Sequence, residues 1–251
     1  MRQDVNRTRQ DKRAEISFFQ QYAKIQKYDV FTEKSSHKII EECLALSCLE
    51  QGARVVDLGC GSGVFTRLLN DHHLNCSGLD ISHEMMARGR VSNPNIRFVG
   101  GDIECLPYRS EALDGIILSG VLHHLPDPTA CAREIYRVLK PNGVFVAFDP
   151  NRRNPFMWLY RDWNSPLYSR VGVTQNERPI AETEIKPVFA EAGFRVSTHY
   201  VSGLQFDHMA SSSLGWALSI YHFLDHILFR YEWAKSFRAF VFTSGLKHQW
   251  G

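Results

Sequence analysis

The chain has 251 residues, a length that suits one large α/β domain better than two independent domains. Hydrophobic residues make up 44% of it and charged residues 22%, which excludes a disordered tail protein and a small disulfide scaffold. Lys and Arg total 29 against 27 Asp and Glu, and this small basic excess disfavours a nucleic-acid partner.

The six cysteines are scattered and show no spacing typical of a zinc site. We therefore expect free thiols in a reducing compartment, no bound metal and a cytoplasmic location. The N-terminus has no apolar signal-peptide core. Polar residues interrupt the longest apolar stretch, Leu214 to Trp233, so no transmembrane segment is predicted.

The first part of the chain predicts helices and strands in alternation. Two helices are expected at the start, over residues 1–30 and 36–49. Apolar or β-branched runs then predict strands over residues 54–58, 76–81, 96–99, 113–119 and 143–148. Helical patterns lie between them, over residues 64–72, 83–90 and 129–139. Such alternation predicts right-handed crossovers and a doubly wound sheet with helices on both faces.

The pattern loosens after residue 149. Residues 150–180 hold four prolines among aromatic residues, without a clear period. A helix over 181–192 and a strand over 194–201 are predicted next. A helix over 214–233 and a strand over 237–242 follow. We expect the last two strands to pair antiparallel, because the short remaining tail leaves no room for another crossover.

The most informative stretch runs from Val55 to Gly63, where a buried strand enters a glycine-rich turn and then a helix. Glycines in such a turn permit positive φ angles and let a ligand approach the backbone. The spacing of Gly59, Gly61 and Gly63 lacks the lysine of a phosphate-binding loop. Asp57 precedes the first glycine, and its carboxylate would repel a pyrophosphate but suits a ligand with an ammonium group.

Two further carboxylates lie where predicted strands end. Asp80 closes the second strand and is placed to accept the hydroxyls of a ribose, and Asp102 follows the third and can accept from an adenine amino group. Three carboxylates at successive strand ends describe an adenosyl ligand that carries an amino acid, as S-adenosylmethionine does. The alternative is that each one only caps a turn or helix at the surface.

Residues 45–148 resemble the class I S-adenosylmethionine-dependent methyltransferases, especially the subgroup of ubiquinone and menaquinone biosynthesis enzymes. Besides the glycine loop, the matching motifs span Leu79–Met86, Gly101–Pro107, Leu113–Ile117, Val121–Pro128 and Leu139–Gly143. The resemblance implies a Rossmann-like, mostly parallel seven-stranded sheet with an antiparallel last strand. It also implies an enzyme whose methyl donor is S-adenosylmethionine.

The resemblance further implies which residues hold the donor. The glycine loop would line the methionine moiety through Gly59, Cys60, Gly61 and Gly63, with Asp57 at the amino group. The adenosine moiety would meet the ends of the next strands through Asp80, Ile81, Met85, Asp102 and Ile103. Ser119 would contribute near the methionine end, at the close of the fourth strand.

His123 and His124 are the candidate catalytic residues, because they follow the fourth strand close to the expected methyl group. Either one can act as a general base if the acceptor atom carries a proton. The alternative is that the pair only orients the loop before Pro126. Cys60 is expected to contribute its backbone to the loop rather than a reactive thiol.

The acceptor is expected against residues 150–180, where Trp158 and Trp163 would wall an apolar pocket. Arg152 in this segment would either bind an acidic group of the acceptor or lie on a solvated loop face. Tyr22, from the N-terminal helix, would either close over the donor or pack the helix. The 214–233 helix packs in the core or a homodimer, or forms a lid or contacts a membrane surface.

We expect one domain in three parts. Residues 1–50 would cover the cofactor site, 51–149 would form the S-adenosylmethionine-binding core, and 150–251 would complete the domain with acceptor-binding insertions at 150–180 and 204–236. The expected function is in-line methyl transfer to a small molecule of apolar or lipid-like character. The alternatives are a catalytically inactive S-adenosylmethionine-binding protein and an RNA or protein methyltransferase.

Overall fold

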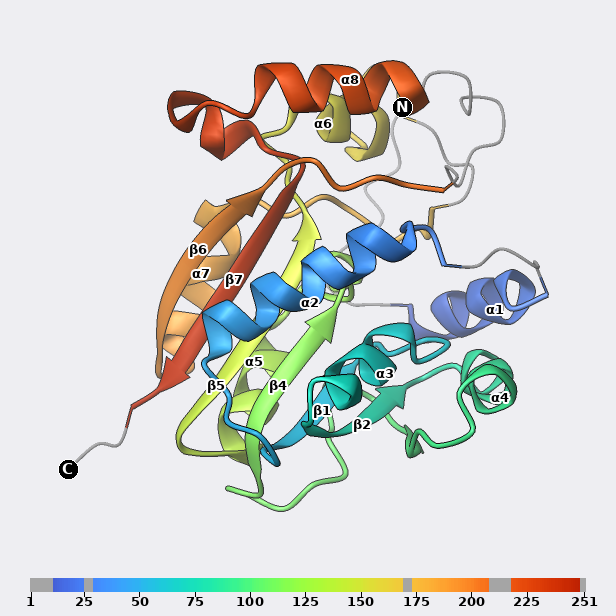
Figure 1. The fold of residues 1–251 in the computed structure, drawn as a ribbon, viewed down its shortest axis with the longest axis vertical. Helices are drawn as coiled ribbons and strands as arrows, with labels where there is room; N and C mark the ends of the chain where they lie inside the picture. The colour runs from blue at the N-terminus through green and yellow to red at the C-terminus, as the bar shows by residue number, and fades with distance from the viewer. Residues whose placement is uncertain (1–10, 25–28, 169–172, 208–217, 249–251) are drawn as a thin grey trace.

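The fold is built on a seven-stranded sheet with the strand order β3-β2-β1-β4-β5-β7-β6 (Figure 1). The computed structural model describes residues 11–24, 29–168, 173–207 and 218–248. The strands are β1 (Arg54–Leu58), β2 (Asn75–Asp80), β3 (Phe98–Gly100), β4 (Leu113–Ser119), β5 (Leu139–Pro150), β6 (Phe194–Val201) and β7 (Phe240–Lys247). Strands β1 to β5 pair in parallel, whereas β7 runs antiparallel to both β5 and β6. The predicted sheet is confirmed.

Helices cover both faces of this sheet. They are α1 (Lys12–Tyr22), α2 (Glu33–Ser47), α3 (Val64–Asp71), α4 (His83–Ser92), α5 (Thr129–Val138), α6 (Pro155–Arg161), α7 (Glu182–Glu191) and α8 (Leu218–Leu228). Two short 3-10 turns are η1 (Leu122–His124) and η3 (Glu232–Phe237). Figure 1 shows α2 and α3 in front of the sheet and α5 and α7 behind it. The predicted doubly wound arrangement is therefore present.

The central strands are apolar on both faces because a helical layer covers each of them. Val55 and Val146 belong to the core cluster that contains residues of α2 and α3. Val56 and Phe145 belong to the cluster that contains residues of α5 and α7. Successive side chains of a strand point to opposite faces, and this alternation assigns each residue to its layer.

Several elements differ from the sequence prediction, among them β5, predicted over 143–148, and β7, predicted over 237–242. The first helix is described over α1 and is shorter than the predicted 1–30, of which 1–10 and 25–28 lie outside the described residues. Helix α6 was not predicted; the Asn154 side chain accepts hydrogen bonds from two N–H groups of its first turn, and Pro155 begins it. Of the predicted 214–233 helix, residues 214–217 lie outside the described residues, and the rest forms α8, which ends at Leu228, followed by η3.

The carboxyl ends of the parallel strands open toward the end of the molecule where α6 and α8 lie (Figure 1). Within the described ranges, no helix is long and apolar enough to cross a membrane. All six cysteines lie in the described part of the chain and are free thiols, as predicted. Ligands of doubly wound sheets bind at the carboxyl ends of the strands, so this end is where a functional site is sought.

Candidate active site

The glycine loop that joins β1 to α3 is bound to the end of β2. Gly59, Gly61 and Gly63 have φ angles of +73°, +52° and +83°, which favour glycine. A Cβ on Gly59 would lie 2.8 Å from Cβ of Val121. The backbone N–H of Gly61 donates to Oδ2 of Asp80 at 2.8 Å. The positive φ angles therefore disfavour side chains at all three positions, and Val121 leaves no space for one at Gly59.

A small cavity of about 130 Å³ lies beside this loop. It is lined by the five residues expected at the adenosine moiety: Asp80, Ile81, Met85, Asp102 and Ile103. Helix α1 closes it with Glu15 and Phe19. The structure thus brings together residues from the ends of β2 and β3 that the sequence separates by more than one element.

Asp80 retains the capacity to accept further hydrogen bonds. Its Oδ2 accepts from Gly61 and its Oδ1 accepts from the N–H of Ser82, each at 2.8 Å. A carboxylate oxygen has two lone pairs, so each one has room for a hydroxyl donor. Burial raises the pKa of Asp80, and backbone N–H donors from Ser82 and Gly61 oppose that shift. These features fit the ribose hydroxyls of an adenosyl group.

Asp102 lines the small cavity and also binds helix α1. Lys12 of α1 forms ion pairs with Asp102 and Glu104. Asp102 also accepts from the N–H of Glu104 at 2.9 Å. The carboxylate lines the small cavity, but part of its hydrogen-bonding capacity is used to hold α1 over the cavity.

Asp57 lines neither the small cavity nor the larger cavity next to it, and its expected contact with an ammonium group stays a prediction. Its side chain is fully buried, and its oxygens accept from Ser119 Oγ at 2.5 Å and from Thr66 Oγ1 at 2.6 Å. Burial raises the pKa of Asp57 to about 6, against the lowering effect of these hydroxyls. Ser119 lines both cavities and thus connects Asp57 to them by a hydrogen bond.

Gly63 and Cys60 have structural roles in the glycine loop. Gly63 caps the N-terminus of α3 and lines neither cavity, and a Cβ there would lie 2.7 Å from Cζ of Phe98. The expected contact of Gly63 with the donor stays a prediction. Cys60 lines the larger cavity, and its Sγ would lie 2.6 Å from a Cβ on Gly78. Burial raises the pKa of the Cys60 thiol, which disfavours the reactive thiolate.

The larger cavity, here called the main cavity, has a volume of about 510 Å³. It runs from the glycine loop to α6 and α8, and most of its distant wall is aromatic: Phe31, Phe65, Phe148, Phe156, Phe206, Tyr221 and Phe240. Helix α1 adds Phe18, Phe19 and Tyr22. The two cavities share Phe19, Gly59, Ser119, Gly120 and His124. A ligand that fills the small cavity would therefore extend into the polar end of the main cavity.

His123 forms a buried pair with Asp149 at this polar end. The Nδ1 atom of His123 lies 2.8 Å from Oδ1 of Asp149, and the backbone N–H of His123 donates to the same oxygen at 3.1 Å. Burial lowers the pKa of His123 well below its usual value, and the charge of His124 adds to this effect. The neutral form of His123 is therefore favoured, and a proton on Nδ1 would face the carboxylate and leave a lone pair on Nε2.

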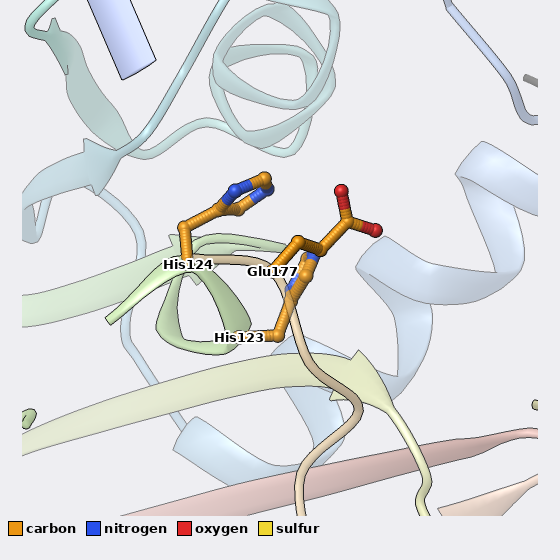
Figure 2. Close-up of side chains that lie close together, drawn as sticks. All are labelled: His123, His124 and Glu177. Carbon is orange, nitrogen blue, oxygen red and sulfur yellow. The ribbon is translucent and has the colours of Figure 1, made fainter. Parts of the chain in front are cut away.

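His124 and Glu177 form a second, charged group beside it. Figure 2 shows the end groups of His123, His124 and Glu177 converging, and one ligand atom of each lies within 4.8 Å of the others. The Nδ1 atom of His124 lies 3.4 Å from Glu15 Oε2. Burial alone would lower the pKa of His124, but the carboxylates of Glu15 and Glu177 outweigh it and raise the pKa. Arg161 Nη1 lies 2.5 Å from Oε1 of Glu177.

Two histidines and one glutamate are a common zinc-binding set. Here the charges of this set already have partners from the chain. Arg161 pairs with Glu177, and Glu15 pairs with His124. A divalent cation would have to compete with both. The arrangement fits a group that holds and moves protons better than it fits a metal centre.

Three of the expected acceptor residues do not line either cavity, and their contact with an acceptor stays a prediction. Arg152 is bound in ion pairs with Asp162 at 2.6 Å and Glu184 at 2.7 Å. The guanidinium carbon of Arg178 lies over the Trp163 ring, 5.0 Å from the centre of that ring. Trp158 is half-buried on the side of α6 away from the main cavity. Tyr22 does line the main cavity.

Several residues of the site were missed by the sequence analysis. They are charged or aromatic residues that line the cavities or pair with lining residues: Glu15, Phe19, Asp149, Phe156, Arg161 and Glu177. Asp149 lies at the end of β5, and the rule that selected carboxylates at the ends of the first three strands could have found it. The others have no local sequence pattern.

Comparisons with known proteins match this chain to methyltransferases. A family model described as "Methyltransferase domain" matches residues 56–147. An uncharacterized methyltransferase of Synechocystis sp. is 31% identical over 168 residues, which cover 65% of this chain and 76% of that protein. The demethylmenaquinone methyltransferase of Renibacterium salmoninarum is 31% identical over 114 residues, 45% of this chain and 48% of that protein.

Among solved structures, Haemonchus contortus phosphoethanolamine N-methyltransferase 2 in complex with S-adenosylmethionine has the same fold. The TM-score is 0.64 at 14% identity, over 93% of this chain and 57% of that chain. Fold, site and relatives define one class of protein, the enzymes that transfer methyl groups from S-adenosylmethionine. The chain belongs to the class I S-adenosylmethionine-dependent methyltransferases, in the part of the family that includes quinone methyltransferases.

Proposed function

We propose that this methyltransferase acts on a small apolar or lipid-like molecule bound in the main cavity, and that His123 removes a proton from the acceptor atom. The observation that carries the proposal is the aromatic wall that begins at the polar end near His123 and continues to α6 and α8. A cavity of this kind selects its ligand by shape and apolar contact, with few polar groups to fix its orientation.

The donor would lie across the two joined cavities. Asp80, Ile81 and Met85 would hold its adenosine group, and the Gly59–Ser62 loop with Ser119 would hold its amino-acid part. The donor supplies a methyl group on a positively charged sulfur, which departs as a neutral thioether. The chain's main contribution is to hold the acceptor in line with that methyl group and to exclude water.

The role of His123 follows from its pairing with Asp149. The carboxylate orients the ring and fixes the proton on Nδ1, so the lone pair of Nε2 is free to accept a proton. An acceptor O–H or activated C–H would transfer its proton to Nε2 as the new bond to the methyl carbon forms. His124, with Glu15 and Glu177, would keep a positive charge beside the reacting atom.

Each part of the chain would have its own role in binding the donor or the acceptor. Residues 1–50 would cover the cofactor, since Lys12 pairs with Asp102, and residues 51–149 would form the donor-binding core. The 150–180 and 204–236 insertions would bind the acceptor through Phe156, Arg161, Phe206 and Tyr221. One relative, from Renibacterium salmoninarum, is named for methylation of demethylmenaquinone, which supports an acceptor of lipid-like character.

The test is a transfer assay with labelled S-adenosylmethionine and acceptors extracted from cells, followed by identification of the labelled product. The proposal expects a labelled small molecule that partitions into organic solvent. A label found only in protein or RNA would contradict the acceptor class. Binding of S-adenosylhomocysteine without any transfer would instead favour a protein that holds the cofactor but lacks catalysis.

A further inference from the structure

The outward face of helix α8 is apolar, although the helix lies at the surface. Figure 1 shows α8 lying across one end of the molecule, next to α6. Four of its described side chains are large, hydrophobic and exposed: Ile220, Phe223, Ile227 and Leu228. Phe223 is 63% exposed. A surface helix of a globular protein normally directs such a stripe toward the core.

Two polar side chains on the inner side of α8 bind the rest of the domain. Asp225 is 1% exposed and accepts a hydrogen bond from the N–H of Gly203 at 2.7 Å. Nε2 of His222 accepts from the N–H of Phe206 at 3.1 Å. Phe229 is the buried apolar residue near the end of the helix. Because these contacts fix α8 to the domain, its outer hydrophobic residues are not needed to hold it there.

The 3-10 turn η3 extends the apolar surface. Tyr231, Trp233 and Phe237 are exposed, and Trp233 is 80% exposed. The rings of Tyr231 and Trp233 stack with their centres 6.5 Å apart. The seven residues form one surface, here called the α8 face: Ile220, Phe223, Ile227, Leu228, Tyr231, Trp233 and Phe237. Tyrosine and tryptophan are favoured at the boundary between lipid and water.

Positive charges border the α8 face. The Arg153 guanidinium lies 5.6 Å from the ring centre of Phe237, and that of Arg230 lies 4.8 Å from the ring centre of Tyr231. Lys235 is also exposed, and its Nζ lies 3.7 Å from Oε2 of Glu232. Among the described side chains of residues 220–237, Glu232 is the exposed acid, and it pairs with Arg238 at 2.7 Å. The net positive charge complements anionic lipid headgroups.

The α8 face lies on the opposite side of a helix from the main cavity. Tyr221, which follows Ile220 in the chain, lines the cavity and contacts Phe156 with ring centres 5.5 Å apart. An apolar molecule at the outer face of α8 is therefore separated from the cavity by one helix. Exposed apolar patches of this size on a protein surface mark sites of interaction.

We propose that the α8 face docks this protein on the surface of an anionic lipid bilayer. Phe223, Ile227 and Trp233 enter the boundary between headgroups and acyl chains, and Arg153, Arg230 and Lys235 contact the headgroup phosphates. The protein lies on the bilayer and does not span it. This docking needs neither cofactor nor acceptor, so it stands or falls separately from the proposed reaction.

The test is sedimentation of the full chain with two kinds of vesicles: phosphatidylcholine alone, and equal parts of phosphatidylcholine and phosphatidylglycerol. We expect stronger binding to the anionic vesicles. Replacing Phe223 and Trp233 by Ser should weaken binding at least about tenfold, because two large apolar side chains no longer leave water. The control is Val91→Ser, since Val91 is 85% exposed at the end of α4, away from the α8 face.

The positive charges that border the α8 face provide a second test of the proposal. Arg230→Gln and Lys235→Gln should each weaken binding to the anionic vesicles by about fivefold and leave binding to phosphatidylcholine unchanged. Circular dichroism of each variant checks that the fold is retained. The proposal would be overturned if wild-type protein bound neither kind of vesicle. A second outcome would also overturn it: wild-type protein forms a dimer in sedimentation velocity, the Phe223→Ser, Trp233→Ser protein does not, and neither protein binds vesicles.

Discussion

The imidazole of His123 and the carboxylate of Asp149 form a pair that joins the turn after β4 to the end of β5, with Nδ1 and Oδ1 2.8 Å apart. Asp149 is 2% exposed, and burial raises its pKa. The backbone N–H of His123 donates to the same carboxylate and favours its ionised form. A buried carboxylate that holds one face of a histidine ring leaves the other ring nitrogen to accept a proton.

The first prediction concerns this pair. Asp149→Asn should lower kcat by about 100- to 10,000-fold, because an amide N–H facing Nδ1 would stabilise the tautomer with the proton on Nε2. His123→Gln should have a similar effect. The affinity for S-adenosylhomocysteine should stay within about twofold of wild type, as calorimetry can measure. Asp127→Asn, on the exposed turn before α5, is the control.

The pH profile gives an independent readout of the same pair. Because the pKa of His123 is lowered, its neutral form persists below pH 6.5, so kcat/KM should fall only at more acidic pH. The groups facing it are Asp149, His124, Glu177 and Arg161, and loss of the Glu177 charge should shift the acid limb. Unchanged kcat and pH profile in His123→Gln would show that the acceptor needs no base.

The second prediction concerns the donor. Asp80→Asn should weaken S-adenosylhomocysteine binding about ten- to 150-fold, because charge-assisted hydrogen bonds to the ribose become neutral ones. Asp71→Asn is a matched control, since Asp71 is exposed on α3 and pairs with Arg67. A dissociation constant equal to that of wild type in folded Asp80→Asn protein would leave Asp80 as a residue that only binds the glycine loop.

The third prediction separates two neighbouring aromatic residues of α6. Phe156 lines the main cavity, whereas Trp158 does not. Phe156→Ala should therefore raise the KM for the acceptor about tenfold or more, and Trp158→Ala should change it less than about twofold. Both variants should bind S-adenosylhomocysteine as wild type does. Equal effects of the two substitutions on KM would place the acceptor elsewhere.

The fourth prediction is a pH dependence of stability. The pKa of Asp57 is raised to about 6 in the folded protein from 3.8, mainly by burial, so the native state binds more protons than the unfolded state between these values. The stabilising contribution of Asp57 is therefore complete below about pH 4 and is lost as the pH rises through 6. Relative to wild type, Asp57→Asn should gain up to roughly 3 kcal/mol of unfolding free energy between pH 4 and 7.

Urea denaturation at several pH values measures this difference. Asp71→Asn should show no such trend, because its carboxylate is exposed. A constant offset between Asp57→Asn and wild type at all pH values would mean that Asp57 titrates normally in the folded state.

The sequence predicted the regular part of the fold well. The bounds of β1, β4 and β6 agree with the predicted strands. β1 and β4 are short and largely apolar, whereas β6 alternates in exposure and begins directly after Gly193. Helix α6 was missed since its seven residues show no period, and its start depends on the Asn154 cap. The length of the 214–233 helix was overestimated because apolar residues continue beyond α8 into η3, where they are exposed.

The donor side of the site was predicted better than the acceptor side for a physical reason. Asp80 and Asp102 lie at strand ends, and the parallel sheet brings strand ends together. Glu15 and Glu177 reach the polar end of the main cavity from α1 and a loop, and only the tertiary fold brings them to His124. Aromatic composition pointed to the α6 region, but it could not tell Phe156, which faces the cavity, from Trp158, which does not.

The most direct test of the account is one transfer experiment with labelled S-adenosylmethionine, a lipid-containing cell extract, and wild-type, Asp80→Asn and His123→Gln proteins. The account predicts label in the organic phase with wild-type protein, little with Asp80→Asn at limiting donor, and little with His123→Gln even at saturating donor. Label that stays in the aqueous phase, or organic label that is equal for wild type and His123→Gln, would contradict it.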